Sequence, residues 1–409
     1  MSLVGRCLVS TMLALVLAVS LAAFEQPASA ARWVTSWTTS QQGLGDAMVT
    51  DATVRLVARV TSGGESVRIR LDNSYGTTPL RIGSVSVGHR MRGAALVPGS
   101  NRSVRFAGAV AVVIPPGGTV QSDPVALTVL ARQDLAVSLH LPGTDVRPSL
   151  HNGALVTSYL SASGAGDLTT DDSADRLTET ITSMWWLKGI DVLTTSSVGA
   201  IVAFGDSITD GSCATVDAYD RWEDWLAIRL DAVGAPGARF AVANEGIGGN
   251  TVTGKGLEPP PSSTPGVDRL ERDVLSHAGV TDVVLFMGTN DIRRDASAQQ
   301  VIAGMETIIE QVHDRGLQIH GVTIIPRHNR APTSNNSGWT TEKTRIRNEV
   351  NEWIRTDAPF DGVLDFDQAV RDPANPDQIA PAFNCDGIHP TPRGYYEMGW
   401  SVPLDLFTR

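Results

Sequence analysis

The chain has 409 residues, 19% of them charged, and a formal net charge of −11 at pH 7. This acidity argues against a nucleic acid or an anionic membrane surface as the partner. The length exceeds what one hydrophobic core ordinarily supports, so two domains are expected.

The N-terminus has the pattern of a secretory signal. Arg6 precedes an apolar run at residues 7–24, which is followed by Ala28-Ser29-Ala30. A positive start, a short apolar stretch and an A-x-A exit are typical of a signal peptide, here residues 1–30. The run is short and polar at its end for a membrane span of about 20 residues. We therefore expect a secreted protein without stable membrane insertion.

Residues 31–197 are predicted to form an all-β domain. Apolar and polar residues alternate in four short segments, at 67–71, 80–82, 84–87 and 137–141. This period of two is typical of half-buried strands, and Gly, Pro and Asn-rich turns separate the segments. Short strands at such spacing indicate a β-sandwich or a jelly roll.

Residues 198–409 have a different pattern. Apolar runs, which suit parallel strands buried on both faces, are continuous at 200–204, 240–243 and 283–287 and nearly continuous at 319–325. Helical periodicity occurs in two separate segments, at residues 222–230 and at residues 297–315. Alternating strands and helices predict an α/β domain with a central parallel sheet. Residues 251–265 form a long stretch almost without pattern, which suggests a loop near a site.

Cysteine usage fits an exported protein. Cys7 leaves with the signal, so only Cys213 and Cys385 remain. An even pair suggests a disulfide, and two buried free thiols are the alternative. Neither cysteine has a His or Cys at metal-ligand spacing, so no metal and no cofactor are expected.

Two motifs contain candidate catalytic residues. Gly205-Asp206-Ser207 follows the first apolar run, at a strand-to-helix turn where open α/β sheets bind ligands. Asp386 stands three residues before His389, so its carboxylate can fix the imidazole tautomer and leave the other nitrogen free as a base. A surface turn and a C-terminal loop histidine are the plain alternatives.

Two further motifs follow predicted strands. The amide of Asn290 stands after the 283–287 run and is suited to donate to an oxyanion, although an Asx turn is common there. Asn244 begins a stretch that contains Gly248 and Gly249, whose backbones can approach a ligand closely. This stretch lacks the G-x-G-x-x-G pattern of a dinucleotide loop.

Together the four motifs resemble those of the SGNH (GDSL) hydrolase family, which supply a Ser, a Gly, an Asn and a His in this order. The resemblance covers residues 199–409 and implies a three-layer, flavodoxin-like hydrolase domain. It implies Ser207 as nucleophile and His389 as base, with Asp386 orienting the base. Ser207, Gly249 and Asn290 would form the oxyanion hole, with Gly248 as the alternative to Gly249.

The N-terminal half is similar to a two-domain subgroup of that family. Residues 36–41 and 68–76, with Pro79-Leu80, look like segments of the XynE-like bacterial acylhydrolases and arylesterases, in which a β domain precedes the catalytic one. This resemblance implies a small-molecule or carbohydrate ester as the partner. The oligomeric state and the role of the β domain stay open.

The implied activity is that of a serine esterase for short acyl, aryl or acetyl-carbohydrate esters. A lipase or phospholipase of the same family is the alternative, although no long apolar stripe is present. An α/β-hydrolase would need a G-x-S-x-G elbow, which the chain lacks. A non-catalytic carbohydrate-binding protein would be favoured only if Ser207, Asp386 or His389 were missing.

The resemblance also has a consequence for the cysteines. If the fold brings Ser207 to His389, it also brings Cys213 near Cys385, so we expect these two to be bonded. Substrate contacts are expected less firmly at His151 and Asn152, and at residues 327–329, which follow the last predicted strand.

Overall fold

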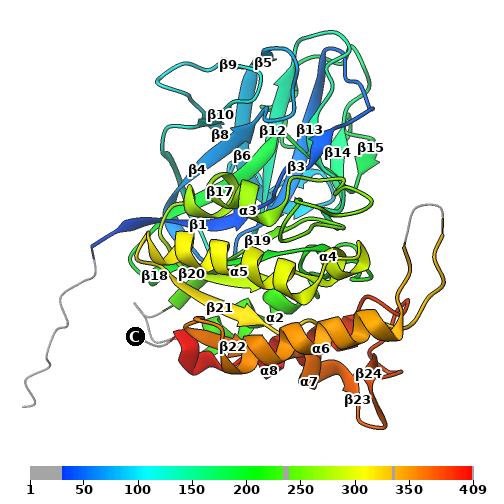
Figure 1. The fold of residues 1–409 in the computed structure, drawn as a ribbon. Helices are drawn as coiled ribbons and strands as arrows, with labels where there is room; N and C mark the ends of the chain where they lie inside the picture. Colours follow the sequence, from blue (N-terminus) through cyan, green and yellow to red (C-terminus); the bar gives the residue numbers. More distant parts are fainter. Residues whose placement is uncertain (1–29, 234–238, 334–336, 408–409) are drawn as a thin grey trace, which may run out of the picture.

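The computed structural model describes residues 30–233, 239–333 and 337–407, and within them it has an antiparallel β half and an α/β half (Figure 1). The predicted signal peptide comprises residues 1–30, and all of these except Ala30 lie outside the described residues. The last strand of the antiparallel sheets in the β half is β17 (Leu187–Thr194), and the parallel sheet begins with β18 (Ser197–Gly205).

The β half consists mainly of two antiparallel sheets. One has the order β1 (Arg32–Thr38), β17, β4 (Gly64–Asp72), β10 (Thr119–Gln121), with β11 (Val125–Val129) also paired to β4. The other has the order β15 (Glu179–Ile181), β14 (Ser158–Leu160), β3 (Ala52–Arg59), β12 (Asp134–Leu141), β6 (Ser84–Arg92), β7 (Ala95–Leu96), with β8 (Arg102–Val104) paired to β6. Smaller sheets join β16 (Met184–Trp185), β13 (Ser149–His151) and β2 (Gly43–Leu44), and β5 (Leu80–Ile82) with β9 (Val112–Ile114).

The alternation seen in the sequence accounts for the core of this half. Ile69 and Leu71 of β4 and Val137 and Leu139 of β12 are fully buried and belong to one apolar cluster shared by the two sheets. Side chains of a strand alternate between its faces, so every second residue enters this core. The predicted β-sandwich class is confirmed.

The α/β half is built on one parallel sheet. Its order is β19 (Arg239–Gly246), β18, β20 (Val280–Phe286), β21 (Gln318–Val322), β22 (Gly362–Leu364). One face is covered by α3 (Gly266–Leu270), α5 (Ala298–His313) and α6 (Thr341–Thr356), and the other by α2 (Trp222–Val233), α7 (Phe366–Val370) and α8 (Pro392–Ser401). Short elements complete the half: α1 (Ser207–Asp210), a π-helical turn (Glu271–Leu275), α4 (Thr289–Arg293), the hairpin of β23 (Arg371–Asp372) and β24 (Asn375–Ile379), and a 3₁₀ turn (Leu404–Phe407).

Successive residues of β18 enter the two different apolar clusters, Val202 and Phe204 on one face, Ile201 and Ala203 on the other. Burial on both faces explains the unbroken apolar run and confirms the three-layer prediction. Within the described ranges, no helix combines the length and the apolarity that crossing a bilayer requires.

One predicted strand is shorter than expected. The apolar run at 319–325 is buried to its end, but β21 ends at Val322. The reason is a change of hydrogen-bond partner, since Ile324 N donates to the side-chain Oδ1 of Asn351 at 2.7 Å instead of to a neighbouring strand. An apolar run reports burial and not strand pairing.

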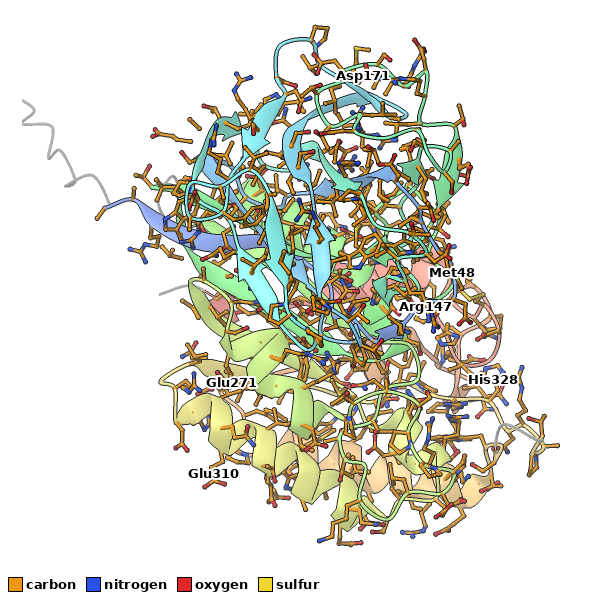
Figure 2. All side chains as sticks on the ribbon, turned by 90° about the horizontal axis from the view of Figure 1, so that it is seen from above. Met48, Arg147, Asp171, Glu271, Glu310 and His328 are labelled. Atoms are coloured by element: carbon orange, nitrogen blue, oxygen red, sulfur yellow. A yellow bond between two sulfur atoms is a disulfide. The ribbon has the colours of Figure 1, made fainter. Side chains whose placement is uncertain are left out.

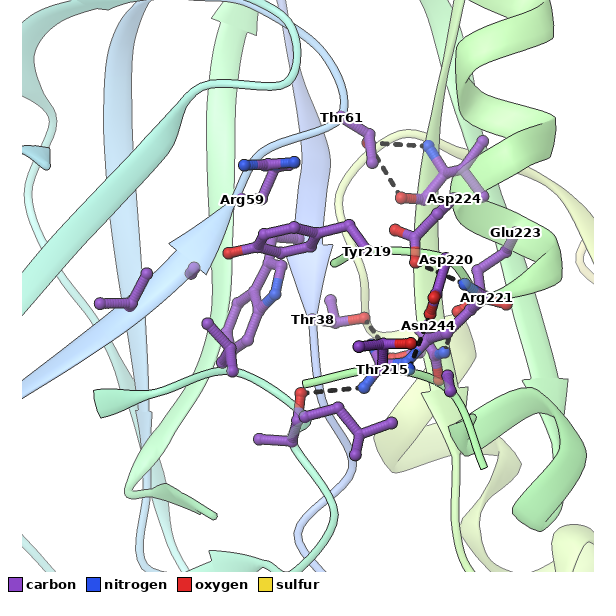
Figure 3. A pocket seen from close by; sticks show the side chains of 18 residues that line it. Thr38, Arg59, Thr61, Thr215, Tyr219, Asp220, Arg221, Glu223, Asp224 and Asn244 are labelled. Atoms are coloured by element: carbon purple, nitrogen blue, oxygen red, sulfur yellow. Dashed lines mark hydrogen bonds between the residues drawn. The ribbon is translucent and has the colours of Figure 1, made fainter. Parts of the chain in front are cut away.

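The two halves are in direct contact. Val34 of β1 packs with Ala200 of β18 and Ala241 of β19, and Thr35 N donates to Ala278 O at 2.8 Å. A cavity of about 50 Å³ lies between the halves, lined among others by Arg59, Tyr219, Glu223 and Asn244 (Figure 3).

Candidate active site

Each predicted motif lies at the carboxyl edge of the parallel sheet or against it. Ser207 begins α1 directly after β18, Gly249 follows β19, and Asn290 lies in α4 after β20. His389 stands in the loop before α8. Since parallel strands end at the same edge, segments distant in sequence meet there.

The turn that carries Ser207 is determined by its neighbours. A Cβ on Gly205 would lie 2.0 Å from Thr209 Oγ1, so only glycine fits before the turn. Asp206 Oδ1 accepts a hydrogen bond from Ile208 N at 3.0 Å and thereby caps α1. The serine is placed at the very start of this helix, where backbone N–H groups point outward.

Ser207, His389 and Asp386 form a chain of hydrogen bonds. Ser207 Oγ lies 2.9 Å from His389 Nε2, and His389 Nδ1 lies 2.9 Å from Asp386 Oδ2. Ser207 is 9% exposed. The predicted nucleophile, base and orienting carboxylate each lie within hydrogen-bond reach of the next, as acyl transfer through a serine requires.

Hydrogen bonds to the backbone hold the loop of residues 385–389, which we call the acid–base loop. Asp386 Oδ1 accepts from Ile388 N at 3.0 Å and from His389 N at 2.9 Å, while Cys385 N donates to His389 O at 3.0 Å. Burial alone would raise the pKa of Asp386, but hydrogen bonds from the backbone and ring of His389 hold that pKa below its ordinary value. The carboxylate is therefore charged at neutral pH and fixes the ring orientation.

One of the predicted oxyanion donors, Asn290, is already engaged in hydrogen bonds. Asn290 Nδ2 donates to Asn250 O at 3.0 Å and to Asp206 Oδ2 at 3.3 Å. Burial raises the pKa of Asp206 to about 7, so this acceptor is partly protonated near neutrality and its bond is the weaker one. Gly249 has a φ of +73°, and a Cβ added to it would meet no atom within 4 Å. A Cβ added to Gly248 would lie 3.6 Å from Asp210 Oδ2.

The expected disulfide between Cys213 and Cys385 is present, and the two cysteines are separated by 172 positions in the sequence. It joins the turn after α1 to the residue next to Asp386. Tyr395 of α8 reinforces the same turn, because its hydroxyl donates to Ser212 O at 2.7 Å. The disulfide is confirmed as a covalent link between the nucleophile turn and the acid–base loop.

We expect the Cys213→Ser, Cys385→Ser double variant to lose about 2–5 kcal/mol of unfolding free energy, because the bridge closes a long loop in the unfolded chain. Denaturant titration without reductant measures the loss. The control is the native protein treated with dithiothreitol, which should approach the stability of the variant. Equal midpoints for native and variant protein would contradict a structural role.

Arg269 of α3 is a positioning residue that the sequence analysis missed. Its guanidinium is fully buried. Nη2 donates to Gly205 O at 3.0 Å and to Glu245 O at 2.9 Å, and Nε donates to Asn250 Oδ1 at 3.0 Å. One side chain thus joins the loops that follow β18 and β19 and that carry Ser207 and Gly249.

The residues around Arg269 connect it to the β half. Its Nη1 donates to Ser40 Oγ at 2.8 Å, and Ser40 also donates to Glu245. Glu245 Oε1 accepts from His277 Nε2 at 2.5 Å, and Arg70 Nη1 donates to His277 Nδ1 at 2.6 Å. Burial, and after it the charge of Arg70, lowers the pKa of His277, so this ring is neutral.

His151, expected less firmly as a substrate contact, is instead buried against the nucleophile helix. Its Nε2 lies 2.9 Å from Asp210 Oδ1, and its Nδ1 lies 2.8 Å from Ser40 O. Burial alone would lower the pKa of His151, but the Asp210 carboxylate outweighs burial and raises it. Asn152 is exposed beside it, and its backbone N donates to Gln42 Oε1 at 3.4 Å.

A second polar chain supports α1 from the other side. Asn244 Nδ2 donates to Thr209 O at 2.6 Å and to Glu223 Oε1, and Thr38 of the β half donates to Asn244 O at 3.1 Å (Figure 3). Burial, followed by the nearby Asp224, raises the pKa of Glu223 to about 8. The nucleophile helix is therefore fixed by buried polar contacts as well as by apolar packing.

The His151–Asp210 pair predicts a pH-dependent stability. A histidine whose pKa is raised on folding stabilises the protein fully below its ordinary pKa of about 6.5, and this contribution is lost as pH rises through the folded value. We expect the melting-temperature gap between native protein and His151→Asn to be widest near pH 6 and to narrow towards pH 9. The matched control is His89→Asn, because His89 Nε2 contacts only the carbonyl of Thr128. A constant gap across this range would contradict the pair.

Residues 327–329 lie where the sequence placed them, beyond the end of β21. Arg327 is 5% exposed and lines, with His328 and Asn329, an open recess of about 310 Å³ that also includes Asp386. Figure 2 shows His328 at the periphery of the α/β half.

One group of three potential metal ligands occurs among the described residues, formed by Cys213, Asp386 and His389. The sulfur of Cys213 is bonded to Cys385, and His389 Nδ1 is engaged with Asp386. This leaves no thiolate for a metal.

Comparisons with known proteins agree with this architecture. The pattern of the GDSL-like lipase/acylhydrolase family matches residues 203–396. A comparison with curated proteins finds no match.

Several solved structures are similar to about half of this chain. Est24, a carbohydrate acetylesterase from Sinorhizobium meliloti, is 20% identical over 49% of this chain and 94% of its own, with a TM-score of 0.38. The aryl esterase of M. smegmatis is 21% identical over 50% and 95%, with a TM-score of 0.36. A member of the lipolytic protein G-D-S-L family from Veillonella parvula is 20% identical over 49% and 94%, with a TM-score of 0.34. No substrate is inferred from similarities at this level.

The family match extends from within β18 into α8 and includes all four motifs. The C-terminal half of this chain is therefore a GDSL-like lipase/acylhydrolase domain.

Proposed function

We propose that the protein is a secreted serine esterase that hydrolyses carboxylic esters through an acyl-enzyme on Ser207. The observation that carries this proposal is the hydrogen-bonded chain from Ser207 Oγ to His389 and on to Asp386, at 2.9 Å for each step. The family match supports the ester as substrate class. Short acyl, aryl and acetyl-carbohydrate esters suit this arrangement.

The reaction follows from the geometry. His389 Nε2 takes the hydroxyl proton as Ser207 Oγ bonds to the ester carbonyl carbon, and Asp386 stabilises the imidazolium that forms. The tetrahedral intermediate collapses as its bond to the alkoxy oxygen breaks, and His389 returns the proton to the departing alcohol. Water, deprotonated by the same histidine, then attacks the acyl carbon and releases the acid and Ser207.

Stabilisation of the oxyanion is assigned to the backbone N–H groups of Ser207 and Gly249 and to the amide of Asn290. For Asn290 to act, the developing oxyanion must replace the 3.3 Å contact to Asp206. The 3.0 Å bond to Asn250 O stays and holds the amide in orientation. An anion is a stronger acceptor than a carboxyl that is partly protonated, so the exchange is favourable.

We expect Asn290→Ala to lower kcat by roughly 10²–10³-fold with little change in KM, because an oxyanion donor acts mainly in the transition state. Steady-state kinetics with 4-nitrophenyl acetate measures this. An effect confined to KM would contradict the role. Asn290→Asp is a useful companion, since it is similar in size but places an acceptor where a donor is needed.

The experiment that tests the proposed function is covalent trapping combined with an ester panel. A fluorophosphonate should add to Ser207, identified by peptide mass spectrometry, in the native protein and far more slowly in His389→Ala. An acyl-chain series of 4-nitrophenyl esters, run beside acetylated xylan and a phospholipid, then separates esterase from lipase. Absence of labelling together with absence of hydrolysis would overturn the proposal.

Secretion is part of the same proposal. The N-terminal pattern of residues 1–30 supports it, as does the Cys213–Cys385 disulfide, because such bonds persist mainly in oxidising compartments. N-terminal sequencing of protein from the medium of an expressing bacterium should begin at Ala31. Retention of the full chain in the cytoplasm would contradict export.

A further inference from the structure

Four arginines gather at the active-site edge of this acidic protein. Arg293 and Arg294 end α4, and Arg327 and Arg330 follow β21. Among the residues that the structure describes, none of the four forms an ion pair with a carboxylate, although most other arginines near a carboxylate do so. We name these four residues the arginine cluster.

Two members of the arginine cluster are buried. Arg294 and Arg327 are each 5% exposed, and the Nε atoms of Arg293 and Arg294 are buried with no hydrogen-bond partner in the described structure. The nearest bond of the Arg327 guanidinium is a long one, from Nη1 to Thr289 Oγ1 at 3.5 Å, and its Cζ lies 5.2 Å from the centre of the Trp339 ring. Burying a cation without a partner is costly, so an anion is the natural complement.

The charges of the cluster reinforce one another. Burial, and next the charge of Arg293, lowers the pKa of Arg327 to about 10, and Arg330 acts in the same direction. Arg294 in turn lowers the pKa of Arg293 after burial. The carboxylates of Asp206 and Asp386 act on Arg327 in the opposite direction, but its pKa stays below the ordinary value.

The carboxylates nearest to Arg327 are already engaged. Asp206 accepts from Ile208 N and Asn290 Nδ2, and Asp386 is bound to the backbone and ring of His389. Asp206 and Asp386 both face Arg327 electrostatically without reaching ion-pair distance. Neither supplies a partner for the guanidinium.

The position of the cluster relates it to the reaction. Arg327 and Arg330 line the recess of about 310 Å³ together with Asp386, Gly387 and Ile388, the three residues before His389. Arg330 Nη2 also donates to Asp386 O at 3.2 Å. Because Asp386 lines the recess and also holds His389, a substituent of the ester that entered this recess would meet Arg327 and Arg330.

We propose that this recess is a subsite for a carboxylate on the substrate, so that the preferred ester bears a negative charge on its acyl or its alcohol part. This inference rests on the proposed function. The planar guanidinium of Arg327 donates to the carboxylate in a fork, and the other arginines add attraction at longer range. Esters of dicarboxylic acids and acylated uronic or aromatic acids belong to this class.

Two matched ester pairs test the subsite. The acyl arm compares the 4-nitrophenyl monoester of adipic acid with 4-nitrophenyl hexanoate, and the alcohol arm compares 3-acetoxybenzoate with its methyl ester. We expect Arg327→Gln to lower the anionic-to-neutral ratio of kcat/KM by roughly ten- to hundredfold in at least one arm, because a charge-assisted hydrogen bond is lost. Arg330→Gln, at an exposed position, should lower the same ratio less and guards against misfolding of the first variant.

The matched control is Arg345→Gln, because Arg345 is an exposed arginine of α6 paired with Glu342 and Glu349. It should leave both ratios unchanged. Ratios that stay within twofold in both arms, for Arg327→Gln and Arg330→Gln alike, would overturn the subsite while neutral esters are still hydrolysed. Failure to hydrolyse the neutral esters would instead overturn the proposed function.

A binding measurement tests the subsite even if the neutral esters are not hydrolysed. Calorimetric titration of Ser207→Ala with 3-acetoxybenzoate and with the adipate monoester reports affinity without turnover. The subsite is supported if at least one of these compounds binds to Ser207→Ala and if that binding weakens with added salt. The binding should also weaken in the double variant that combines Ser207→Ala with Arg327→Gln. If neither binds more tightly to Ser207→Ala than to the double variant, the subsite is refuted.

Discussion

Replacement of Ser207 by alanine is expected to lower kcat for 4-nitrophenyl acetate by roughly 10⁴–10⁶-fold and to leave the melting temperature nearly unchanged. The variant loses one oxygen atom from a side chain that is 9% exposed and whose hydroxyl contacts His389. The helix cap supplied by Asp206 stays, so the turn keeps its shape. The variant keeps the proposed oxyanion donors but has no nucleophile.

The matched control for this variant is Ser212→Ala. Ser212 lies in the same turn, and its backbone carbonyl, which the substitution keeps, accepts from Tyr395. Initial rates of both variants are measured at one enzyme concentration, with circular dichroism to verify folding. Activity of Ser207→Ala within tenfold of the native enzyme would exclude Ser207 as nucleophile.

The second large effect is expected at Arg269. Replacement by alanine removes the donors to Gly205 O, Glu245 O and Asn250 Oδ1, and Gly205 O keeps only the bond from Ile247 N at 3.2 Å. Breaking a buried ionic network in this way costs about 3–5 kcal/mol of unfolding free energy. The segments that carry Ser207 and Gly249 then lose their side-chain link and keep only bonds such as Ile247 N to Gly205 O and Asn244 Nδ2 to Thr209 O, so kcat should fall by about 10²-fold.

Arg269→Lys and Arg272→Ala complete the test. A lysine keeps the charge beside Asp273 but cannot span three acceptors in a plane, so it should restore stability in part and kcat poorly. Arg272 contacts the same Asp273 without reaching those loops, and its loss should reduce stability with a smaller change in kcat. Urea unfolding and steady-state kinetics provide both readouts. Native stability and kcat in Arg269→Lys would exclude the positioning role.

The parts of the site that could be predicted from sequence are those whose signal is local. A run of apolar residues followed by a Gly-Asp-Ser or Gly-Thr-Asn motif places Ser207 and Asn290 at strand ends without any knowledge of tertiary contacts. The cysteine pairing followed from the same placement, since Cys213 and Cys385 flank Ser207 and Asp386.

Arg269 could not be predicted because no local pattern marks it. It is one of 33 Lys and Arg residues, on a helix of five residues, and its importance comes from acceptors supplied by separate loops. The arginine cluster was visible only as Arg327, because the absence of partners is a property of the folded chain. Strand ends were also missed where a side chain, such as Asn351, replaces a backbone acceptor.

A weak signal did exist for the contacts between the halves. The segments at 36–41 and 68–76, noticed only for their resemblance, contain Ser40 and Arg70. These two residues contact Glu245, Arg269 and His277. Ser40 and Arg70 belong to segments that match a family pattern but contain no candidate catalytic residue. Such polar residues indicate an interface between the two halves.

The bonds across that interface limit how this protein can be rearranged. Lys188 of the β half is paired with the buried Asp273 at 2.9 Å, and His151 is paired with Asp210 on the nucleophile helix. A hydrolase half transplanted onto another carrier would keep both carboxylates but lose Lys188 and His151, although Arg269 and Arg272 would still pair with Asp273. We therefore expect the two halves to be most stable when they are expressed as one chain.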